Sequence, residues 1–246
     1  MKQKNTIIIV MPAYYAEKTL EKTFHDIPKD YISHIILVDD ASGDKTVSEA
    51  KKLGIQTYVH THNLGYGGNQ KTCYWEALKK NPDVVVMLHP DYQYDATKIE
   101  RMVEPILKGE YDIMLGSRIR TRKEALDGGM PLVKYIGNRI LTTCDNIILG
   151  VNLSEHLSGF RAYSRRVLET IPFQRFSNDF AFDQQFIASA ISFDFRIGET
   201  PVAVRYFKEA SSIAGFRGIK YVTESFLTLI RFALHNAKII TSPLFQ

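Results

Sequence analysis

The feature that most constrains this chain of 246 residues is the alternation, through its first half, of apolar β-branched runs with amphipathic segments. The apolar runs predict strands at 6–11, 34–39, 56–60, 84–88 and 112–116. The segments between them predict helices at 17–27, 45–53, 68–80 and 97–107. Strands that are apolar along their whole length and separated by helices favour a mostly parallel sheet covered on both faces. The sequence therefore predicts an α/β fold with a Rossmann-like sheet.

The second half of the chain has a different pattern. The polar stretch IRTRKEALDGGMP, at 119–131, has no periodicity and predicts a loop over the site. Beyond it, helices are expected at 132–149, 182–191 and 218–240, and strands at 160–164, 195–198 and 202–206. No internal repeat or linker divides the chain, so we expect one domain over residues 1–246. Within it we distinguish a first half, about 1–118, a second half, about 119–217, and the terminal amphipathic helix, about 218–240.

Composition narrows the class of protein. Apolar residues make up 45% of the chain and charged residues 24%, which is typical of a globular domain. The formal net charge of +4 is too small to indicate nucleic-acid binding, but it suits a phosphate-bearing ligand or an anionic surface. Cys73 and Cys144 match no metal-binding spacing, so a reduced, cytoplasmic protein is expected.

Membrane contact is left open by the sequence. We expect neither a signal peptide nor a transmembrane span, because no run of about 18 apolar residues occurs. In the terminal helix, Thr228, Arg231, His235 and Lys238 lie three or four residues apart and predict one polar, basic stripe. This helix either packs on its own domain or lies on the cytoplasmic face of an anionic membrane.

Polar side chains follow two of the expected strands, where ligands bind in parallel sheets. In HPDYQYD, Asp91, Gln93 and Asp95 alternate, and Asp91 and Gln93 can converge on a hard cation such as Mg²⁺ or Mn²⁺, whereas Asp95 is better explained as a helix N-cap. Asp39 and Asp40 close the second strand. They can accept hydrogen bonds from a nucleobase or ribose, or they can form a turn.

Three further features each allow two interpretations. Gly65-Tyr66-Gly67-Gly68 can serve close backbone packing or a nearby diphosphate. Glu155 can act as a general base or remain a solvated loop residue. The arginines at segment ends either bind phosphate oxygens or form surface salt bridges, and these are Arg118, Arg161 and Arg205.

Five short motifs occur in a fixed order along the chain. They are VMPAY at 10–14, VDDAS at 38–42, NLGYG at 63–67, LGSR at 115–118 and SGFRA at 158–162. In this order they resemble the family 2 glycosyltransferases, which have the GT-A fold. The resemblance runs from about residue 5 to residue 215 and is closest to the soluble relatives of dolichyl-phosphate mannose synthase and other polyprenyl-phosphate sugar transferases.

The resemblance implies roles for individual residues. Those at or beside the family's nucleotide-sugar contacts are Pro12, Tyr14, Glu17, Asp39, Asp40, Gly67 and Asp91. Asp91 takes the place of the last aspartate of the family's D-x-D, and Gln93 that of a metal-binding glutamine. Arg118, Arg161 and Arg205 are implied to meet the diphosphate or the acceptor phosphate, and Glu155 stands at an acceptor-side position.

Two positions depart from the family pattern. The first aspartate of D-x-D is His89, whose imidazole is a softer metal ligand than a carboxylate. The metal is then held by fewer protein oxygens, or it is a different ion. The family's Asn-Glu after Pro-Ala-Tyr is Tyr15-Ala16, which removes a carboxylate near the nucleotide, and Glu17 is a candidate substitute.

Taken together, these features predict an inverting, Mg²⁺- or Mn²⁺-dependent transfer of a sugar from a nucleotide-diphosphate sugar to a dolichyl or undecaprenyl phosphate. Asp91 and Arg118 are the expected catalytic groups, and Glu155 becomes the base if the acceptor is a hydroxyl. Two alternatives remain: a family 2 enzyme with a soluble saccharide or other hydroxyl acceptor, and a sugar-nucleotide-binding protein without catalysis.

Overall fold

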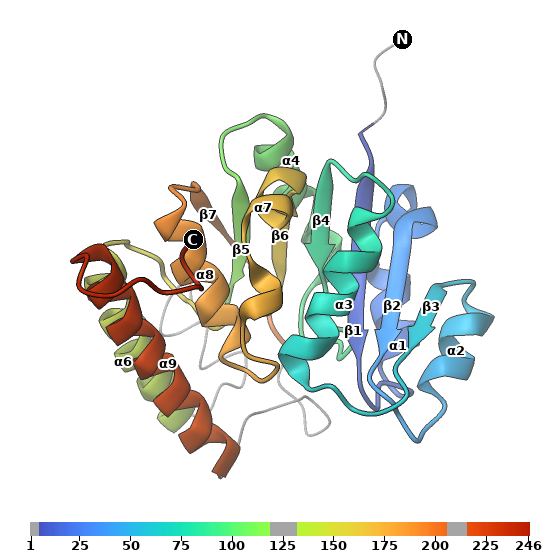
Figure 1. Ribbon diagram of the computed structural model, residues 1–246. Coiled ribbons are helices and arrows are strands. Elements are labelled where there is room, and N and C mark those ends of the chain that lie inside the picture. Colours follow the sequence, from blue (N-terminus) through green and yellow to red (C-terminus); the bar gives the residue numbers. More distant parts are fainter. Residues whose placement is uncertain (1–4, 119–131, 206–215) are drawn as a thin grey trace.

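The computed structural model describes residues 5–118, 132–205 and 216–246, and its centre is a seven-stranded sheet (Figure 1). The strands are β1 (Ile7–Ala13), β2 (Ile35–Asp39), β3 (Gln56–Val59), β4 (Val84–Met87), β5 (Ile113–Ser117), β6 (Arg161–Ser164) and β7 (Ile197–Pro201). Their order across the sheet is β3-β2-β1-β4-β6-β5-β7. Only β6 runs antiparallel to its neighbours, β4 and β5. The predicted α/β class and mostly parallel sheet are therefore confirmed.

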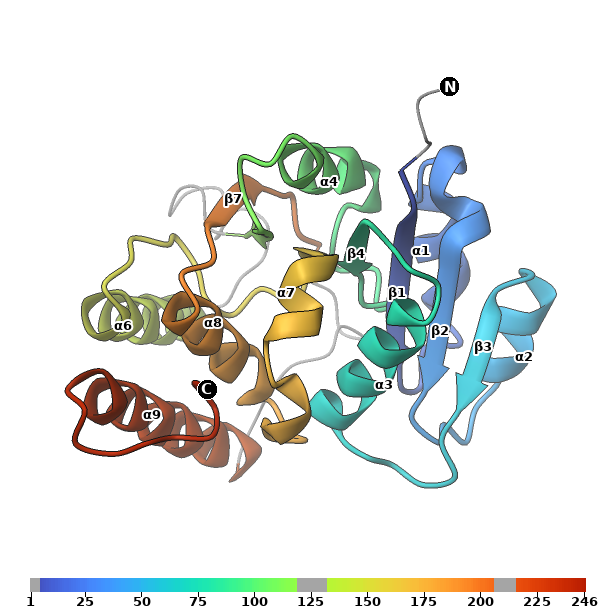
Figure 2. The ribbon, with the colours of Figure 1, turned by 45° about the horizontal axis from the view of Figure 1, so that its top comes forward.

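Helices cover both faces of the sheet (Figures 1 and 2). The α-helices are α1 (Leu20–Asp26), α2 (Thr46–Lys52), α3 (Tyr66–Leu78), α4 (Ile99–Leu107), α6 (Leu132–Leu149), α7 (Arg165–Thr170), α8 (Phe182–Ser192) and α9 (Phe216–Asn236). Short 3₁₀ helices occupy Lys29–His34, Ala96–Lys98 and Phe173–Arg175. Figure 2 shows α3, α7 and α8 on one side of the sheet and α1, α2 and α4 on the other.

Two apolar clusters fill the spaces between the sheet and its two helical layers. Alternate residues of β1 divide between them, because successive strand side chains point to opposite faces. Ile8 and Val10 belong to the cluster that includes Phe182 of α8, whereas Ile9 and Met11 belong to the cluster that includes Met102 of α4. Every residue of β1 is buried, as its unbroken apolar sequence predicted.

Several predicted boundaries are wrong. The first helix begins at Leu20 rather than 17, because the preceding residues bond to the α2 region instead. The last sheet strand covers Ile197–Pro201 rather than 195–198, and 202–205 pairs only through one bridge, between Val204 and Tyr94. Helix α7 was not predicted, although Ser164 accepts a hydrogen bond from Val167 N as its N-cap. The loop expected at 119–131 lies outside the described residues.

The terminal helix also differs from its prediction. It ends at Asn236, just before Lys238 adopts a positive φ of 58°. Thr228, placed by the sequence on a polar outer stripe, is buried and donates to Glu224 O. Helix α9 packs against α8 and α6. No helix within the described ranges is long and apolar enough to cross a bilayer.

Candidate active site

Four parallel strands, β1, β2, β4 and β5, end at the same edge of the sheet, which is the lower edge in Figure 1. Most residues predicted to form a site lie on the segments that leave this edge. Open α/β sheets bind their ligands in the crevice beyond these strand ends. The position of the candidate site therefore follows from topology.

Asp39, the last residue of β2, offers a vacant acceptor at this edge. Its side chain is buried, and Oδ2 accepts a hydrogen bond from Ser42 N at 2.8 Å. Oδ1 has no hydrogen-bond partner among the described residues. A buried carboxylate oxygen without a donor is costly, so this atom suits a donor from a ligand, such as a ribose hydroxyl or a base N–H.

Pro12 and Tyr14 lie beside Asp39. Pro12 is buried in β1, in register with Val38 of β2. Tyr14 follows the strand and is 54% exposed, with its ring edge-on to Tyr15 at a centroid separation of 4.6 Å. An exposed aromatic ring next to a vacant carboxylate oxygen can stack on a planar base.

Asp40 has a different role from its neighbour. Its carboxylate accepts from Leu64 N at 2.8 Å and Gly65 N at 3.0 Å, and Oδ1 lies 2.8 Å from His60 Nδ1. These contacts hold the Asn63-Leu64-Gly65 turn against the end of β2. Asp40, predicted to contact the nucleotide, thus uses both oxygens within the protein, and through these contacts it shapes the site.

Glu17 and Gly67 also make contacts within the protein. Glu17 Oε2 accepts from Lys45 N at 2.8 Å, just before α2. A Cβ on Gly67 would lie 2.3 Å from Ser177 O, and Gly67 N donates to Asn178 O at 2.8 Å. The glycine therefore permits close contact between α3 and the 177–179 segment. Packing, one of the two interpretations of the glycine-rich stretch, describes Gly67.

His89 follows β4 and is held by Tyr66 of α3. The Tyr66 hydroxyl donates to Asp183 Oδ2 at 2.7 Å, because a carboxylate oxygen only accepts. The same hydroxyl lies 3.2 Å from His89 Nε2, so its oxygen accepts the Nε2 proton. Burial lowers the pKa of His89, despite Asp91 and Asp183 nearby. The imidazole is consequently neutral near pH 7, with the lone pair on Nδ1.

Arg161 is fully buried beneath this network. It lies 3.5 Å from Asp183 Oδ2 and donates to three main-chain carbonyls, those of Ser158, His156 and Asp183. The sequence assigned Arg161 to the acceptor phosphate. Its 1% exposure and its bonds to protein carbonyls correct that assignment to a structural one, because the guanidinium does not reach a ligand.

Asp91 lies on the turn that leaves β4. Its Oδ1 accepts from Gln93 N at 3.1 Å across Tyr92, which has a positive φ of 59°. The Gln93 side chain is buried, and the main-chain carbonyl of Gln93 accepts a hydrogen bond from Arg205 N at 2.9 Å. No group of three or more His, Cys, Asp or Glu side chains that could hold a metal occurs in the parts of the chain described.

Arg205, in the segment that follows β7, packs against the same turn. Its guanidinium covers the Tyr92 ring at 4.2 Å and pairs with Asp26 at 3.0 Å, while 43% of the side chain stays exposed. Asp95 instead caps the following helix by accepting from Thr97 N at 3.1 Å, as the N-cap interpretation predicted. Arg205 thus places a positive charge next to the turn that carries Asp91.

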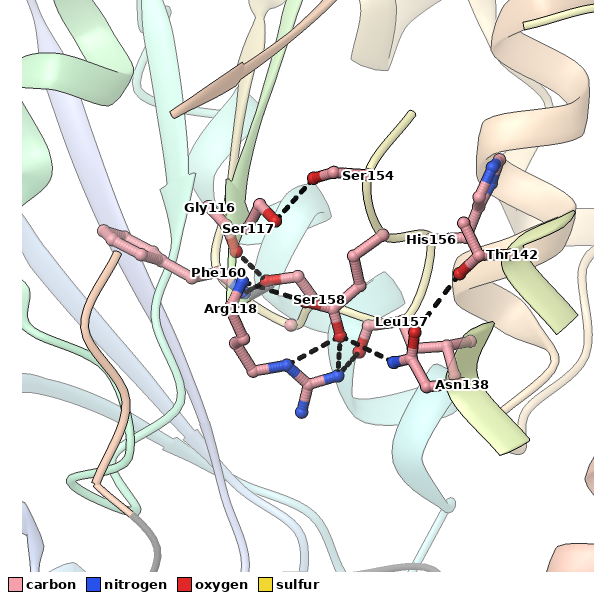
Figure 3. A network of polar contacts seen from close by, with 12 residues as sticks. Gly116, Ser117, Arg118, Asn138, Thr142, Ser154, His156, Leu157, Ser158 and Phe160 are labelled. Atoms are coloured by element: carbon pink, nitrogen blue, oxygen red, sulfur yellow. Dashed lines mark hydrogen bonds and ion pairs between the residues drawn. The ribbon is translucent and has the colours of Figure 1, made fainter. Parts of the chain in front are cut away.

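Arg118 and Glu155 form an enclosed ion pair where β5 ends (Figure 3). Glu155 is fully buried. It accepts from Arg118 N at 2.9 Å, from Nε at 2.7 Å, from Nη2, and from Asn138 Nδ2 of α6 at 3.0 Å. Arg118 also donates to Leu157 O at 3.0 Å. Four donors occupy the carboxylate, so its predicted role as a general base has no support in this geometry.

Several residues of this network were not predicted. Glu199 of β7 accepts from Ser154 N at 2.8 Å and Glu155 N at 3.2 Å, which fixes the loop ahead of the Ser-Gly-Phe-Arg motif. Tyr66, Asn138 and Asp183 were missed as well. Each comes from a different element. Tyr66 lies within the NLGYG motif, but no local pattern indicates its contact with His89, and Asn138 and Asp183 belong to no motif, so only the assembled fold brings these three residues together.

The comparisons with known proteins agree with this geometry. A model of glycosyl transferase family 2 matches residues 8–171. The chain belongs to glycosyl transferase family 2. This makes it a glycosyltransferase enzyme, as the five motifs predicted.

Its relatives in the family include proteins that act on lipid phosphates. An uncharacterized protein of Methanocaldococcus jannaschii is 31% identical, covering 89% of this chain and 88% of its own. The UDP-N-acetylglucosamine–dolichyl-phosphate N-acetylglucosaminyltransferase of Methanococcus voltae is 26% identical, covering 81% and 86%. The polyprenol monophosphomannose synthase of Mycolicibacterium smegmatis is 25% identical, covering 79% and 76%.

Solved structures show that this glycosyltransferase has the GT-A fold. Glucosyl-3-phosphoglycerate synthase of Mycobacterium tuberculosis matches with a TM-score of 0.69 at 20% identity, covering 93% of this chain and 81% of that chain. The same enzyme in complex with Mn²⁺, UDP and phosphoglyceric acid matches with a TM-score of 0.66 at 18% identity, covering 93% and 78%.

Proposed function

We propose that this glycosyltransferase moves a sugar from a nucleotide-diphosphate sugar to a polyprenyl phosphate, with inversion and with a divalent cation. An oxygen of the acceptor phosphate attacks the anomeric carbon, the bond from that carbon to the donor's diphosphate breaks, and the nucleoside diphosphate leaves. The dolichyl-phosphate and polyprenol relatives support this acceptor class. The family, the fold and the site at the strand ends support the donor class.

The nucleotide binds, in this proposal, beyond β1 and β2. Asp39 Oδ1 is the atom that supports this placement, because it is a buried acceptor still lacking a donor. Tyr14 offers an exposed ring for the base. Asp40 contributes indirectly, by fixing the 63–65 turn beside the pocket.

The residues after β4 fit a divalent cation. Asp91 supplies a carboxylate and His89 a neutral imidazole, with Gln93 one residue beyond the turn. Mg²⁺ and Mn²⁺ take few protein ligands and complete their shell with water and substrate phosphate, which agrees with the lack of a three-residue cluster in the described chain. When bound, the ion neutralises charge on the leaving diphosphate. An imidazole ligand favours Mn²⁺ over Mg²⁺.

The enclosure of Glu155 is the observation that carries the choice of acceptor. A hydroxyl acceptor must lose a proton during transfer, whereas a phosphate monoester is already anionic at neutral pH and needs no base. Glu155 faces four donors and no solvent, so it holds Arg118 rather than abstracting a proton. The exposed Arg205 then provides positive charge for the phosphates, whereas the charge of Arg118 is balanced by Glu155.

Transfer assays with matched acceptors test the proposal. Purified protein is incubated with radiolabelled UDP- and GDP-sugars and Mn²⁺, and with either a polyprenyl phosphate in detergent or 3-phosphoglycerate, the acceptor class of the structural neighbour. We expect sugar to appear on the lipid, to disappear with chelator, and to fall at least about a hundredfold in Asp39→Asn. Asp95→Asn, outside the proposed site, is the matched control.

Two results would contradict the proposal. Transfer to the soluble hydroxyl acceptor with none to the lipid phosphate would move the protein to the alternative acceptor class. Protection against melting by a nucleotide-sugar, without turnover on either acceptor, would identify a binding protein instead.

A further inference from the structure

Helices α6 and α9 expose an apolar surface that the proposed transfer reaction does not use. They lie side by side at the end of the sheet farthest from β3 (Figures 1 and 2). We define the α6–α9 apolar face as Val133, Ile136 and Ile140 of α6 with Phe226, Leu227 and Ile230 of α9. Val133 is 83% exposed, Ile140 59% and Phe226 56%. Large apolar side chains gathered in this way mark an interaction surface.

Polar contacts on the inner sides of both helices fix their rotation. On α6, Asn138 donates to Glu155 at 3.0 Å, and Asp145 accepts from Gln184 of α8 at 2.6 Å. On α9, Thr228 lies 3.4 Å from Gln185 Nε2. These polar residues face inward together with the core residues Leu229 and Phe232 of α9, while the residues of the α6–α9 apolar face remain exposed. The apolar exposure is thus part of the fold.

Two basic side chains near this face, Arg231 and Lys238, are exposed. Lys220 is half-exposed, and its charge is balanced by Asp179 at 2.7 Å and Glu224 at 3.7 Å. Asp145, the acidic residue of α6, is buried and does not offset Arg231 or Lys238 at the surface. A symmetric dimer would place each cation opposite its own copy, which is unfavourable. An anionic lipid surface complements both the charge and the apolar side chains.

The position of the face relative to the site fits a lipid acceptor. Asn138, on the inner side of α6, belongs to the Arg118–Glu155 network, one helix width from Val133 and Ile140 on the outer side. Helices α6 and α9 begin towards the edge at which β1 and β2 end (Figure 1). A bilayer touching the outer side would bring its phosphate groups alongside the acceptor part of the site.

We propose that the α6–α9 apolar face inserts into the interface of an anionic bilayer and thereby presents the site to a lipid-borne phosphate. The link to the acceptor rests on the proposed function, whereas the binding of the face to lipid does not. The inserted side chains are those of α6 and α9, in place of the polar stripe that the sequence had suggested for α9.

Fluorescence with plain vesicles tests insertion without substrate. Trp75 is the chain's single tryptophan. A Trp75→Phe/Phe226→Trp protein therefore reports only from the face. With phosphatidylcholine vesicles containing about 30% phosphatidylglycerol, we expect a blue shift and quenching by brominated acyl chains, both weaker at high salt. No shift with these vesicles would overturn the proposal.

Paired variants test the residues. Ile140→Ser/Ile230→Ser removes apolar surface, and we expect vesicle partitioning to fall at least about tenfold. Val59→Ser, at an exposed apolar residue on β3, should leave partitioning unchanged. Melting temperature and transfer to detergent-dispersed polyprenyl phosphate should stay at the wild-type level in both proteins, since neither variant touches the site.

The remaining outcomes separate this proposal from its rivals and from the proposed function. A dimer in sedimentation velocity that the double variant abolishes, with no vesicle binding, would assign the face to a second copy. Transfer in detergent with no vesicle binding would refute lipid binding by the α6–α9 apolar face, and the proposed transfer reaction would remain supported. If vesicle binding is lost in the double variant and no acceptor receives sugar, lipid binding by the α6–α9 apolar face is supported and the proposed transfer reaction is refuted.

Discussion

Asp145 is a buried carboxyl group whose ionised form destabilises the folded protein, and one substitution can remove this destabilisation. It is 2% exposed on the inner side of α6, and its only described hydrogen bond comes from Gln184 Nε2 at 2.6 Å. Burial raises its pKa from 3.8 to about 6. The carboxyl therefore favours the folded state below pH 3.8, and this contribution is lost as the pH rises through about 6.

The magnitude follows from the size of the shift. A difference of about 2 pH units, at about 1.4 kcal/mol per unit, makes ionised Asp145 cost about 3 kcal/mol above pH 6. Asp145→Asn removes the charge and keeps an oxygen for Gln184. Its new N–H can also donate to Gln184 Oε1, a buried acceptor without a partner among the described residues. We expect stabilisation of up to about 3 kcal/mol at pH 8.

Denaturant unfolding at pH 8 and at pH 4 checks this prediction. The gain of Asp145→Asn should shrink to within about 0.5 kcal/mol at pH 4, where the folded carboxyl is already protonated. Glu110→Gln, at an exposed carboxyl, should show no comparable difference between the two pH values. An equal change at both pH values would refute the reasoning, because the effect would then come from packing and not from a desolvated charge.

Further substitutions at three places test other parts of the structure. Tyr66→Phe removes the acceptor of the imidazole Nε2 proton, and we expect Mn²⁺ affinity, measured by calorimetry with nucleoside diphosphate, to weaken about tenfold. Gly67→Ala should lower the melting temperature strongly, whereas Gly137→Ala, whose Cβ meets nothing within 4 Å, should raise stability by about 0.5–1 kcal/mol. Glu155→Gln should destabilise the protein by about 3 kcal/mol, since it leaves the buried partner guanidinium without its counter-charge, and replacing both partners by methionine should restore part of that loss in denaturant unfolding.

The sheet and much of the donor side could be predicted from sequence because their signals are local. Unbroken β-branched and apolar runs such as 35–38 and 84–87, separated by amphipathic segments, favour buried strands, and Asp39 directly follows the first of these runs. The five motifs also predicted the family, and the family comparison confirmed it. Predicted helix and strand boundaries were wrong where a contact with a distant residue sets them. The first helix begins at Leu20 rather than 17, because the chain just before it is held by Thr46, whose Oγ1 accepts from Ala16 N at 2.8 Å.

The sequence by itself determined the α/β class, the family and the edge at which polar groups gather, since periodicity and short motifs act over a few residues. Only the tertiary structure decided what those groups do. It separated Asp39, with a vacant oxygen, from Asp40, whose oxygens hold a turn, and it enclosed Glu155 with donors from β5 and α6. It also buried Thr228 of α9, while Arg231 of the same predicted stripe remained exposed. Burial and hydrogen-bond partners come from residues far apart in the chain, and no local pattern specifies them.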